Sequence, residues 1–266
     1  MWLMRKRIEV ECKRAICSSG MAMALLVGIA IVLWHQYQHV WASEIEQYNF
    51  FCPESLFYRW IGASCFPMQS YLYYLILPVL ASLPAGVSYF EDLHTGYYRN
   101  MYLRNQKKEY LIAKYIAAFV AGGIAVTLPL IVSLYLTAMR FPALAPEPIM
   151  SFGPDRNSVG FSLYYSHPWL HTVLFLVIDF IFAGGLAGIA LLATFFTNYK
   201  FAALITPFVC CYFVFSLDNL FGSNNFSPNY FLIPGFERNN IWEFVISIGV
   251  FMVAAGIYYW KGKRVE

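Results

Sequence analysis

The sequence predicts an all-α polytopic membrane protein with six transmembrane helices, and three observations lead to this prediction. Of the 266 residues, 59% are apolar and 19% are aromatic. Only 12% are charged, whereas ordinary soluble domains hold about 25% charged residues. Six stretches are long and apolar enough to cross, as helices, a hydrocarbon layer about 30 Å thick. Composition therefore places the chain among membrane proteins.

The six predicted spans form one transmembrane domain that covers residues 1–266. They are roughly Ala15 to Trp34, Tyr71 to Phe90, Tyr110 to Thr137, Leu170 to Thr197, Phe201 to Leu217 and Ile241 to Trp260. The first span follows a long charged lead, and no clean small-residue cleavage site comes after it. We therefore expect a membrane span there and not a signal peptide.

The distribution of Lys and Arg predicts the orientation. Fourteen of the eighteen fall on one side of the predicted membrane, namely Arg5, Lys6, Arg7, Lys13, Arg14, Arg99, Arg104, Lys107, Lys108, Lys114, Lys200, Lys261, Lys263 and Arg264. The opposite connections hold Arg59, Arg140, Arg156 and Arg238. Because cationic loops are retained in the cytoplasm, we expect a multi-pass protein of the cell membrane with both termini cytoplasmic. The net charge of +3 is too small to indicate a nucleic-acid partner.

Two segments outside the spans have unusual patterns. The N-terminal stretch from Trp2 to Ile16 places apolar residues among cations at loosely helical spacing. It predicts either a helix lying in the membrane interface or a plain positive flank of the first span. The connection from Ser216 to Asn240 has few charges and many aromatic residues. It predicts a re-entrant segment that dips back into the bilayer or packs on the bundle.

Asp179 is the ionisable residue that lies deepest in a predicted span, within "LVIDFIFAGG". Charged groups in hydrocarbon are costly and often mark a functional site. The carboxyl group is either satisfied by neighbouring polar side chains or lines a polar membrane site. The second interpretation gives an alternative function, a secondary transporter or channel.

Two histidine pairs, His35 with His39 and His167 with His171, have a spacing of four residues. This spacing puts both rings of a pair on one face of a helix, which suits a metal ion. No third ligand lies nearby in the sequence, so we predict no metal site. The first pair leaves open a third function, a membrane enzyme or assembly factor.

The predicted external loop after the first span holds Cys52 and Cys65. A disulfide is chemically permitted there, and two free thiols are the alternative. Gly184 and Gly188 lie four residues apart in "AGGLAGIA" of the fourth span. Small residues at this spacing predict close helix packing, by default within one subunit and alternatively at a dimer interface.

The sequence contains none of three common motifs of nucleotide-binding and hydrolytic sites. The patterns G-x-x-x-x-G-K-[ST], H-E-x-x-H and G-x-S-x-G are all absent. We therefore predict no catalytic residue and no cofactor in this chain, which would not itself be an enzyme.

The connection between the second and third spans reads "FEDLHTGYYRNMYLRNQKKEYLIAKY". A helical register places Leu93, Tyr97 and Met101 on one face and cations such as Arg99 on the other. This pattern predicts an amphipathic surface helix from Glu91 to Lys108. Such a helix is either a lipid-facing collar or an element that inserts into the groove of a partner.

Within this connection, Glu91, Thr95 with Gly96, Arg104 and Lys114 resemble the pattern of ABC-2 type permeases, the membrane subunits of ABC exporters with the type V transporter fold. The order is an acidic residue after the second span, a Gly/Thr pair, a basic residue and a lysine that opens the third span. The family also has an interfacial helix before its first span, as Trp2 to Ile16 would form. Short membrane-dipping helices follow its fifth span, where Phe221 to Phe236 lies here.

The resemblance implies a coupling helix seated on a separate ATPase. Its contact residues here would be Glu91, Asp92, Gly96, Arg99, Arg104, Lys107, Lys108 and Lys114. The implied partners are two ABC ATPase subunits, which hold the ATP and Mg²⁺, and a second permease subunit, identical or similar. The predicted external half is rich in aromatic residues, which suits a hydrophobic or amphipathic substrate such as a peptide, lipopeptide or lipid. Within that class we expect export of a bacteriocin-like peptide or self-protection against one.

Overall fold

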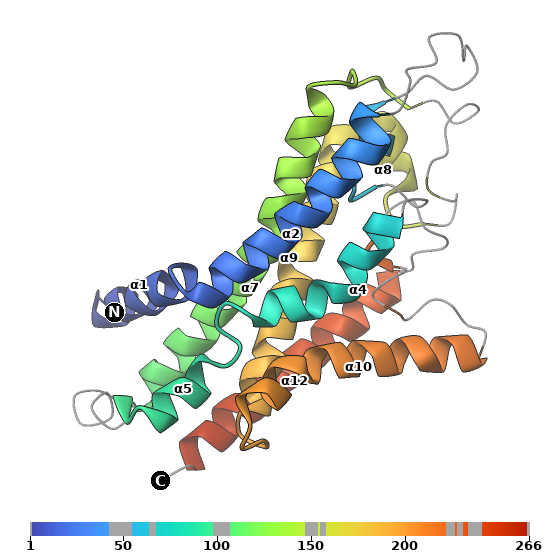
Figure 1. The fold of residues 1–266 in the computed structure, drawn as a ribbon. Helices are drawn as coiled ribbons and strands as arrows, with labels where there is room; N and C mark the ends of the chain where they lie inside the picture. The colour runs from blue at the N-terminus through green and yellow to red at the C-terminus, as the bar shows by residue number, and fades with distance from the viewer. Residues whose placement is uncertain are drawn as a thin grey trace.

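The structure, a computed structural model, describes residues 2–42, 55–63, 68–97, 107–146, 154, 158–221, 227, 231–233 and 241–264. Every regular element within these ranges is a helix. The elements are α1 (Trp2–Ile16), α2 (Ser19–His35), the π-helix η1 (Gln36–Trp41), α3 (Leu56–Arg59), α4 (Met68–Ser82), α5 (Ser88–His94), α7 (Lys107–Ala138), α8 (Phe161–Ser166), α9 (Pro168–Ala193), α10 (Lys200–Phe221) and α12 (Ile241–Arg264). Figure 1 shows them as an elongated bundle.

Five helices of the described chain are long and apolar enough to cross a membrane: α2 with η1, α7, α9, α10 and α12. This arrangement is consistent with a polytopic helical membrane protein. α4 does not meet the same criteria because it has only 15 residues, a length of about 22 Å. The described residues thus contain five such helices where six spans were predicted.

The second predicted span, from Tyr71 to Phe90, differs from the structure because it is not one helix. α4 ends at Ser82 and α5 begins at Ser88, with turns between them. The sequence of the break explains it. Pro84 lacks a backbone N–H and disfavours helical geometry at the residue before it. Gly86 lies so close to the backbone of Ser82 that a Cβ there would be 2.6 Å from its carbonyl oxygen.

Neighbouring helices supply partners for the backbone at this break. The Ser18 hydroxyl donates to the carbonyl oxygen of Pro84 at 3.0 Å. On α2, a Cβ on Gly20 would lie only 2.1 Å from the Leu83 carbonyl oxygen, so only glycine fits there. Interrupted helices are tolerated in membranes where such contacts replace the missing intrahelical bonds.

The pair α7 and α9 forms the centre of the bundle and has the most extensive contact of any two elements. Glycines permit the close approach. A Cβ on Gly184 would lie 2.7 Å from the Phe119 ring, and one on Gly188 would lie 2.6 Å from the Tyr115 hydroxyl. The default prediction for these glycines, tight packing within one subunit, is therefore confirmed.

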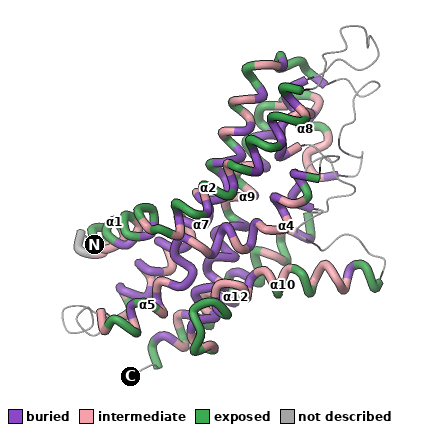
Figure 2. Tube along the Cα trace, viewed as in Figure 1, coloured by how far each residue is buried: buried purple, intermediate pink, exposed green. Residues whose placement is uncertain are grey.

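The remaining helices surround this pair unequally. α2 and α4 pack against α7, and α4, α10 and α12 pack against α9. α10 extends away from the bundle (Figure 1), and its far half is intermediate or exposed except at Asp218 (Figure 2). Only 17% of its most apolar window is buried, against 56% for α7 and for α9. α10 therefore presents most of its apolar surface outward.

The two unusual segments have different outcomes. Trp2–Ile16 is one helix, the conformation that the first of the two N-terminal alternatives requires, and it turns away from α2 at Cys17 and Ser18. The predicted re-entrant segment falls mostly outside the described residues. Of its described residues, Ser216 to Phe221 form the end of α10 and Ser227 is buried. Phe231 to Ile233 are buried in the main apolar core.

Candidate functional site: a buried ion cluster at the cation-rich end

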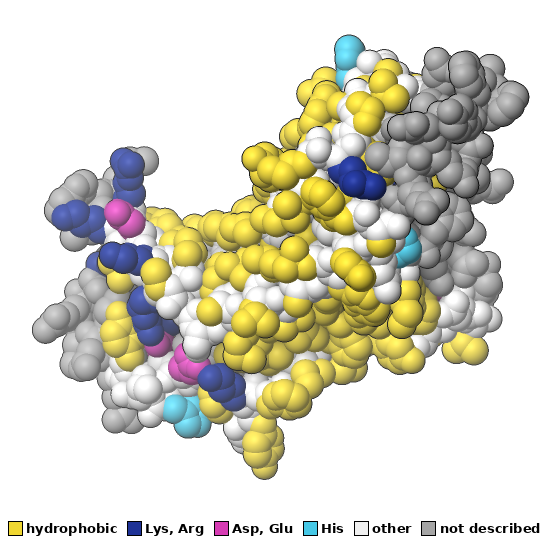
Figure 3. Space-filling view, turned by 45° about the horizontal axis from the view of Figure 1, so that its top comes forward, with side chains coloured by type: hydrophobic (Ala, Val, Ile, Leu, Met, Phe, Trp, Pro, Cys, Tyr) yellow, Lys and Arg dark blue, Asp and Glu magenta, His cyan; other side chains and the backbone are white. Residues whose placement is uncertain are grey.

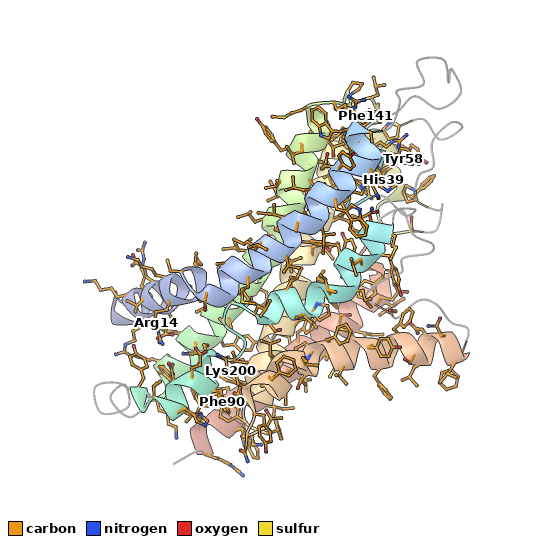
Figure 4. All side chains as sticks on the ribbon, in the orientation of Figure 1. Arg14, His39, Tyr58, Phe90, Phe141 and Lys200 are labelled. Carbon is orange, nitrogen blue, oxygen red and sulfur yellow. The ribbon has the colours of Figure 1, made fainter. Side chains whose placement is uncertain are left out.

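Lys and Arg side chains gather at one end of the bundle. We call it the cation-rich end; it consists of α1, α5, the first turns of α7 and α10 and the last turn of α12. Figure 3 shows dark blue side chains gathered around α1, and Figure 4 places Arg14, Phe90 and Lys200 together at this end. His39, Tyr58 and Phe141 mark the opposite end in Figure 4. The structure thus has the charge asymmetry on which the predicted orientation depends.

Asp92 lies at the centre of a buried ion cluster at this end. Its side chain is 1% exposed. The Lys114 ammonium and the Tyr110 hydroxyl both donate to its Oδ2. Arg14 Nη2 donates to its Oδ1 at 3.0 Å. Both carboxylate oxygens are therefore satisfied by charged or polar groups from α1 and α7.

A second carboxylate, Glu11 of α1, completes the cluster. Arg14 Nη1 donates to its Oε1 at 3.0 Å, and Lys114 Nζ lies 3.4 Å from its Oε2. Lys114 is itself 1% exposed and Glu11 is 5% exposed. The four residues Glu11, Arg14, Asp92 and Lys114 thus balance two positive charges against two negative charges. We call them the ion cluster.

The surroundings shift the pKa values of the exposed and buried members in opposite directions. Burial alone would raise the pKa of Asp92, but the charge of Lys114 and hydrogen bonds from Arg14, Lys114 and Tyr110 hold it below its usual value. Burial would lower the pKa of Arg14, but its bonds to Asp92 and the nearby Glu11 raise it. Both groups are therefore ionised at neutral pH.

Three further contacts connect the helices at this end. Arg7 of α1 forms an ion pair with Glu109 of α7. The exposed Lys200 at the start of α10 pairs with Glu91 of α5. Lys107 Nζ also donates to the carbonyl oxygen of Lys263 on α12 at 3.2 Å. Together with the ion cluster, these contacts connect α1, α5, α7, α10 and α12.

The ion cluster connects helices through paired charges. Each of its four charges is paired with an opposite charge. Buried ion pairs contribute little net stability but are strongly unfavourable to break, so they hold elements in a fixed register. The cluster fixes α1 and α5 against the first turns of α7.

The residues predicted to contact an ATPase are placed in three different ways. Asp92 and Lys114 are buried in the ion cluster, so any role in coupling would be indirect. Glu91, Lys107 and Lys108 lie at least partly exposed. The predicted helix from Glu91 to Lys108 is not continuous, because α5 ends at His94 and a turn follows at Thr95 and Gly96. Arg99 and Arg104 lie outside the described residues.

Gly96 explains where α5 stops. Its φ of +70° is in the left-handed region that favours glycine, and a Cβ there would meet no atom within 4 Å. Conformation and not crowding therefore requires the glycine, and the chain turns where the amphipathic pattern predicted a continuing helix.

Sequence reasoning missed Glu11 and Arg14 as site residues. Arg14 was counted only as a topology marker. Two local signals were available. Glu11 and Arg14 lie three residues apart, and Tyr110 and Lys114 lie four apart, so each pair shares a helical face. Contact between these two helical faces requires α1 to pack against α7. The spacing of residues within each helix does not predict that packing.

Asp179 lies in the middle of α9 and is 1% exposed. The Tyr74 hydroxyl of α4 donates to its Oδ2 at 3.2 Å, and its Oδ1 is a buried oxygen with no hydrogen-bond partner. Among the described residues, the polar side chain that satisfies the Asp179 carboxyl group is thus that of Tyr74.

The histidines pack as ring systems. His171 lies between the rings of Tyr164 and Phe175, with centroids 5.1 and 4.8 Å away. The His35 and His39 rings are 5.4 Å apart, and His39 contacts Gln69 at 3.2 Å. Within the described ranges, no group of three or more His, Cys, Asp or Glu could hold a metal ion.

Cys52 and Cys65 lie outside the described residues, so the disulfide stays a prediction. Cys12, Cys17, Cys210 and Cys211 are free thiols.

Comparisons with known protein families, curated proteins and solved structures found no match to this chain.

Proposed function

We propose that this chain is the membrane-spanning permease subunit of an ABC exporter, driven by ATPase subunits on separate chains. The proposal rests on the resemblance of the α5 to α7 connection to that of ABC-2 type permeases. One structural observation supports it most. Asp92 and Lys114, from the two ends of this connection, meet in the ion cluster together with Arg14 of α1.

The ion cluster would allow the connection to transmit movement. An ATPase bound to the connection would move α5 and the start of α7 together, because the ion cluster resists their separation. The same contacts would transmit the movement to α1 through Arg14 and to α10 through Lys200. Rigid-body movement of helices is a common way to shift a cavity from one side of a membrane to the other.

The ATPase subunits and this chain would have different roles. The ATPase subunits would hold ATP and Mg²⁺ and hydrolyse the nucleotide, while this chain forms the path. A second permease subunit, identical or similar, would form the other half of that path. The substrate class that we propose is hydrophobic or amphipathic: a peptide, a lipopeptide or a lipid. The protein would act in the cell membrane with both termini in the cytoplasm.

Copurification tests this proposal. The affinity-tagged chain is extracted from its native membrane in mild detergent, and the associated proteins are identified by mass spectrometry. We expect an ATPase that carries a G-x-x-x-x-G-K-[ST] motif and whose ATP hydrolysis is stimulated in the complex. If no such ATPase copurifies and a purified one does not bind, the proposal fails.

A secondary transporter or channel that uses Asp179 is the alternative from another class. The buried Oδ1 of Asp179 without a hydrogen-bond partner favours it. Such a carboxyl group inside a membrane helix is a common feature of proton and ion pathways.

A further inference from the structure

A groove lies between α7 and α12 near the cation-rich end. Its volume is about 280 Å³. Leu111, Ile112, Tyr115 and Ile116 of α7 line it together with Ala255 and Tyr259 of α12. Almost all of its surface is apolar. Ligand pockets usually measure roughly 300–1,000 Å³, so the groove suits something narrow, such as part of one hydrocarbon chain.

The packing of α12 on α7 closes the groove at the cation-rich end. A Cβ on Gly262 would lie 2.8 Å from Leu111 Cδ1, so the two helices touch there. Lys107 Nζ also donates across the same point to the Lys263 carbonyl oxygen. Farther from this end, Ala255 offers only a methyl group, which leaves the space between the helices unfilled.

Cations lie next to the closed end. Lys108 precedes the groove residue Ile112 by four residues, and Lys263 follows Tyr259 by four, so each shares a helical face with the groove. Both side chains are exposed. Lys263 Nζ lies 4.3 Å from the centroid of the Tyr259 ring. Two exposed ammonium groups thus lie within reach of a ligand in the groove.

Among the described residues of the adjoining turns, no unpaired acidic group offsets this charge. Glu109 is the acidic residue in the first turn of α7, and it is paired with Arg7 of α1. The last turn of α12 holds Lys261, Lys263 and Arg264, and the acidic residue of that helix, Glu243, lies in its first turn. The closed end of the groove therefore attracts anions.

We propose that this groove is a binding site for an anionic phospholipid. One acyl chain lies in the groove between α7 and α12, and the phosphate group lies beside Lys108 and Lys263. Anionic headgroups are attracted by juxtamembrane lysines, and aromatic rings such as Tyr259 belong at the same depth. The site does not depend on the proposed transport function.

Charge and shape together select this occupant. A zwitterionic lipid would fill the groove equally well but would gain less from the two lysines. A soluble anion would meet the lysines but has no apolar part to fill the groove. A helix of a partner, about 10 Å wide, is too bulky for a groove of about 280 Å³.

Native mass spectrometry of the detergent-purified full chain tests the site. Phosphatidylglycerol and phosphatidylcholine with identical acyl chains are added separately at equal concentration. We expect the wild-type protein to retain phosphatidylglycerol about tenfold more strongly, since each lysine near a headgroup contributes to attraction. This comparison needs no variant, so it is independent of any folding defect.

Two pairs of variants then locate the bound lipid. Ala255→Trp fills the groove, and Val253→Trp, at a position 62% exposed on α12, is its control. Lys108→Gln with Lys263→Gln removes the cations, and Arg5→Gln with Lys13→Gln removes the same charge from exposed positions of α1. We expect only Ala255→Trp and the Lys108/Lys263 double variant to lose most of the preference. Thermal unfolding of each variant confirms that it is folded.

Three results would overturn the proposal. One is equal retention of the two lipids by the wild-type protein. Another is phosphatidylglycerol binding that Ala255→Trp and Val253→Trp leave equally intact. The last is a protein dimer that Ala255→Trp abolishes, because the groove would then hold a second copy of the chain.

Discussion

Asp92 and Lys114 form a buried ion pair between α5 and α7, with both side chains 1% exposed. Replacement of Asp92 by Asn should leave the Lys114 ammonium buried with only the more distant Glu11 carboxylate. We expect a loss of about 3–5 kcal/mol in the free energy of unfolding, the usual cost of breaking a buried pair. Unfolding of the detergent-solubilised protein by dodecyl sulfate measures this loss.

The neighbouring carboxylate supplies the control for this variant. Glu91 pairs with Lys200 where both side chains are about half exposed. Glu91→Gln should therefore cost only about 0–1 kcal/mol. Equal losses for Asp92→Asn and Glu91→Gln would show that the ion cluster does not fix α5 to α7.

Gly184 and Gly188 should be sensitive to added side-chain volume. Their missing Cβ atoms would lie 2.7 and 2.6 Å from α7 side chains. Gly184→Val should lower the free energy of unfolding by about 1–3 kcal/mol through overpacking. Gly249→Val is the control, because a Cβ at Gly249 meets nothing within 4 Å. If both variants unfold at the same denaturant concentration, the close contact of α7 with α9 is absent.

Cys12 of α1 should react slowly with maleimide. Burial and the nearby Glu11 charge raise the pKa of its thiol, and the thiolate is the reactive form. In a variant that keeps Cys12 alone, the labelling rate should rise with pH later than that of a cysteine peptide. Glu11→Gln removes this negative charge, so it should lower the thiol pKa and accelerate labelling several-fold at pH 7.5. An unchanged rate would show that the Glu11 charge does not act on the Cys12 thiol.

Asp179 separates the proposed function from its alternative. If ATP binding by a partner drives transport, Asp179→Asn should retain most of the transport rate, because Asn preserves the shape and a bond to Tyr74. Transport into proteoliposomes by the complex measures this rate. Complete loss of transport in a stably folded Asp179→Asn protein would favour a proton or ion path through α9.

Much of the helical content could be predicted from the sequence because apolar length is a strong signal. The N-terminal helix and the spans that correspond to α9 and α12 begin within about two residues of their predicted starts. The break at Pro84 was visible as a Pro and a Gly within three residues. We nevertheless predicted one continuous span because the apolar residues continue across Pro84, and hydropathy carries no information on backbone geometry.

The candidate site could be predicted only in part. The resemblance to ABC-2 type permeases implied that Asp92 and Lys114 contact an ATPase, because both lie in or next to the same connection. Their partner Arg14 lies 78 residues before Asp92, and no local pattern connects residues so distant. Whether a side chain faces the core or the surface also depends on how the helices pack. Asp92 and Lys114 were expected at the surface, but both are buried.

The proposed function requires the connection between α5 and α7 to bind an ATPase. Binding of the purified ATPase to the wild-type chain and to Arg99→Glu with Arg104→Glu tests it most directly. Arg5→Glu with Lys13→Glu is the control, because it reverses the same charge at exposed positions of α1. We expect at least a tenfold weaker affinity for the Arg99/Arg104 variant alone, with membrane insertion intact. Equal affinity for the wild type and both variants would show that this connection does not bind the ATPase.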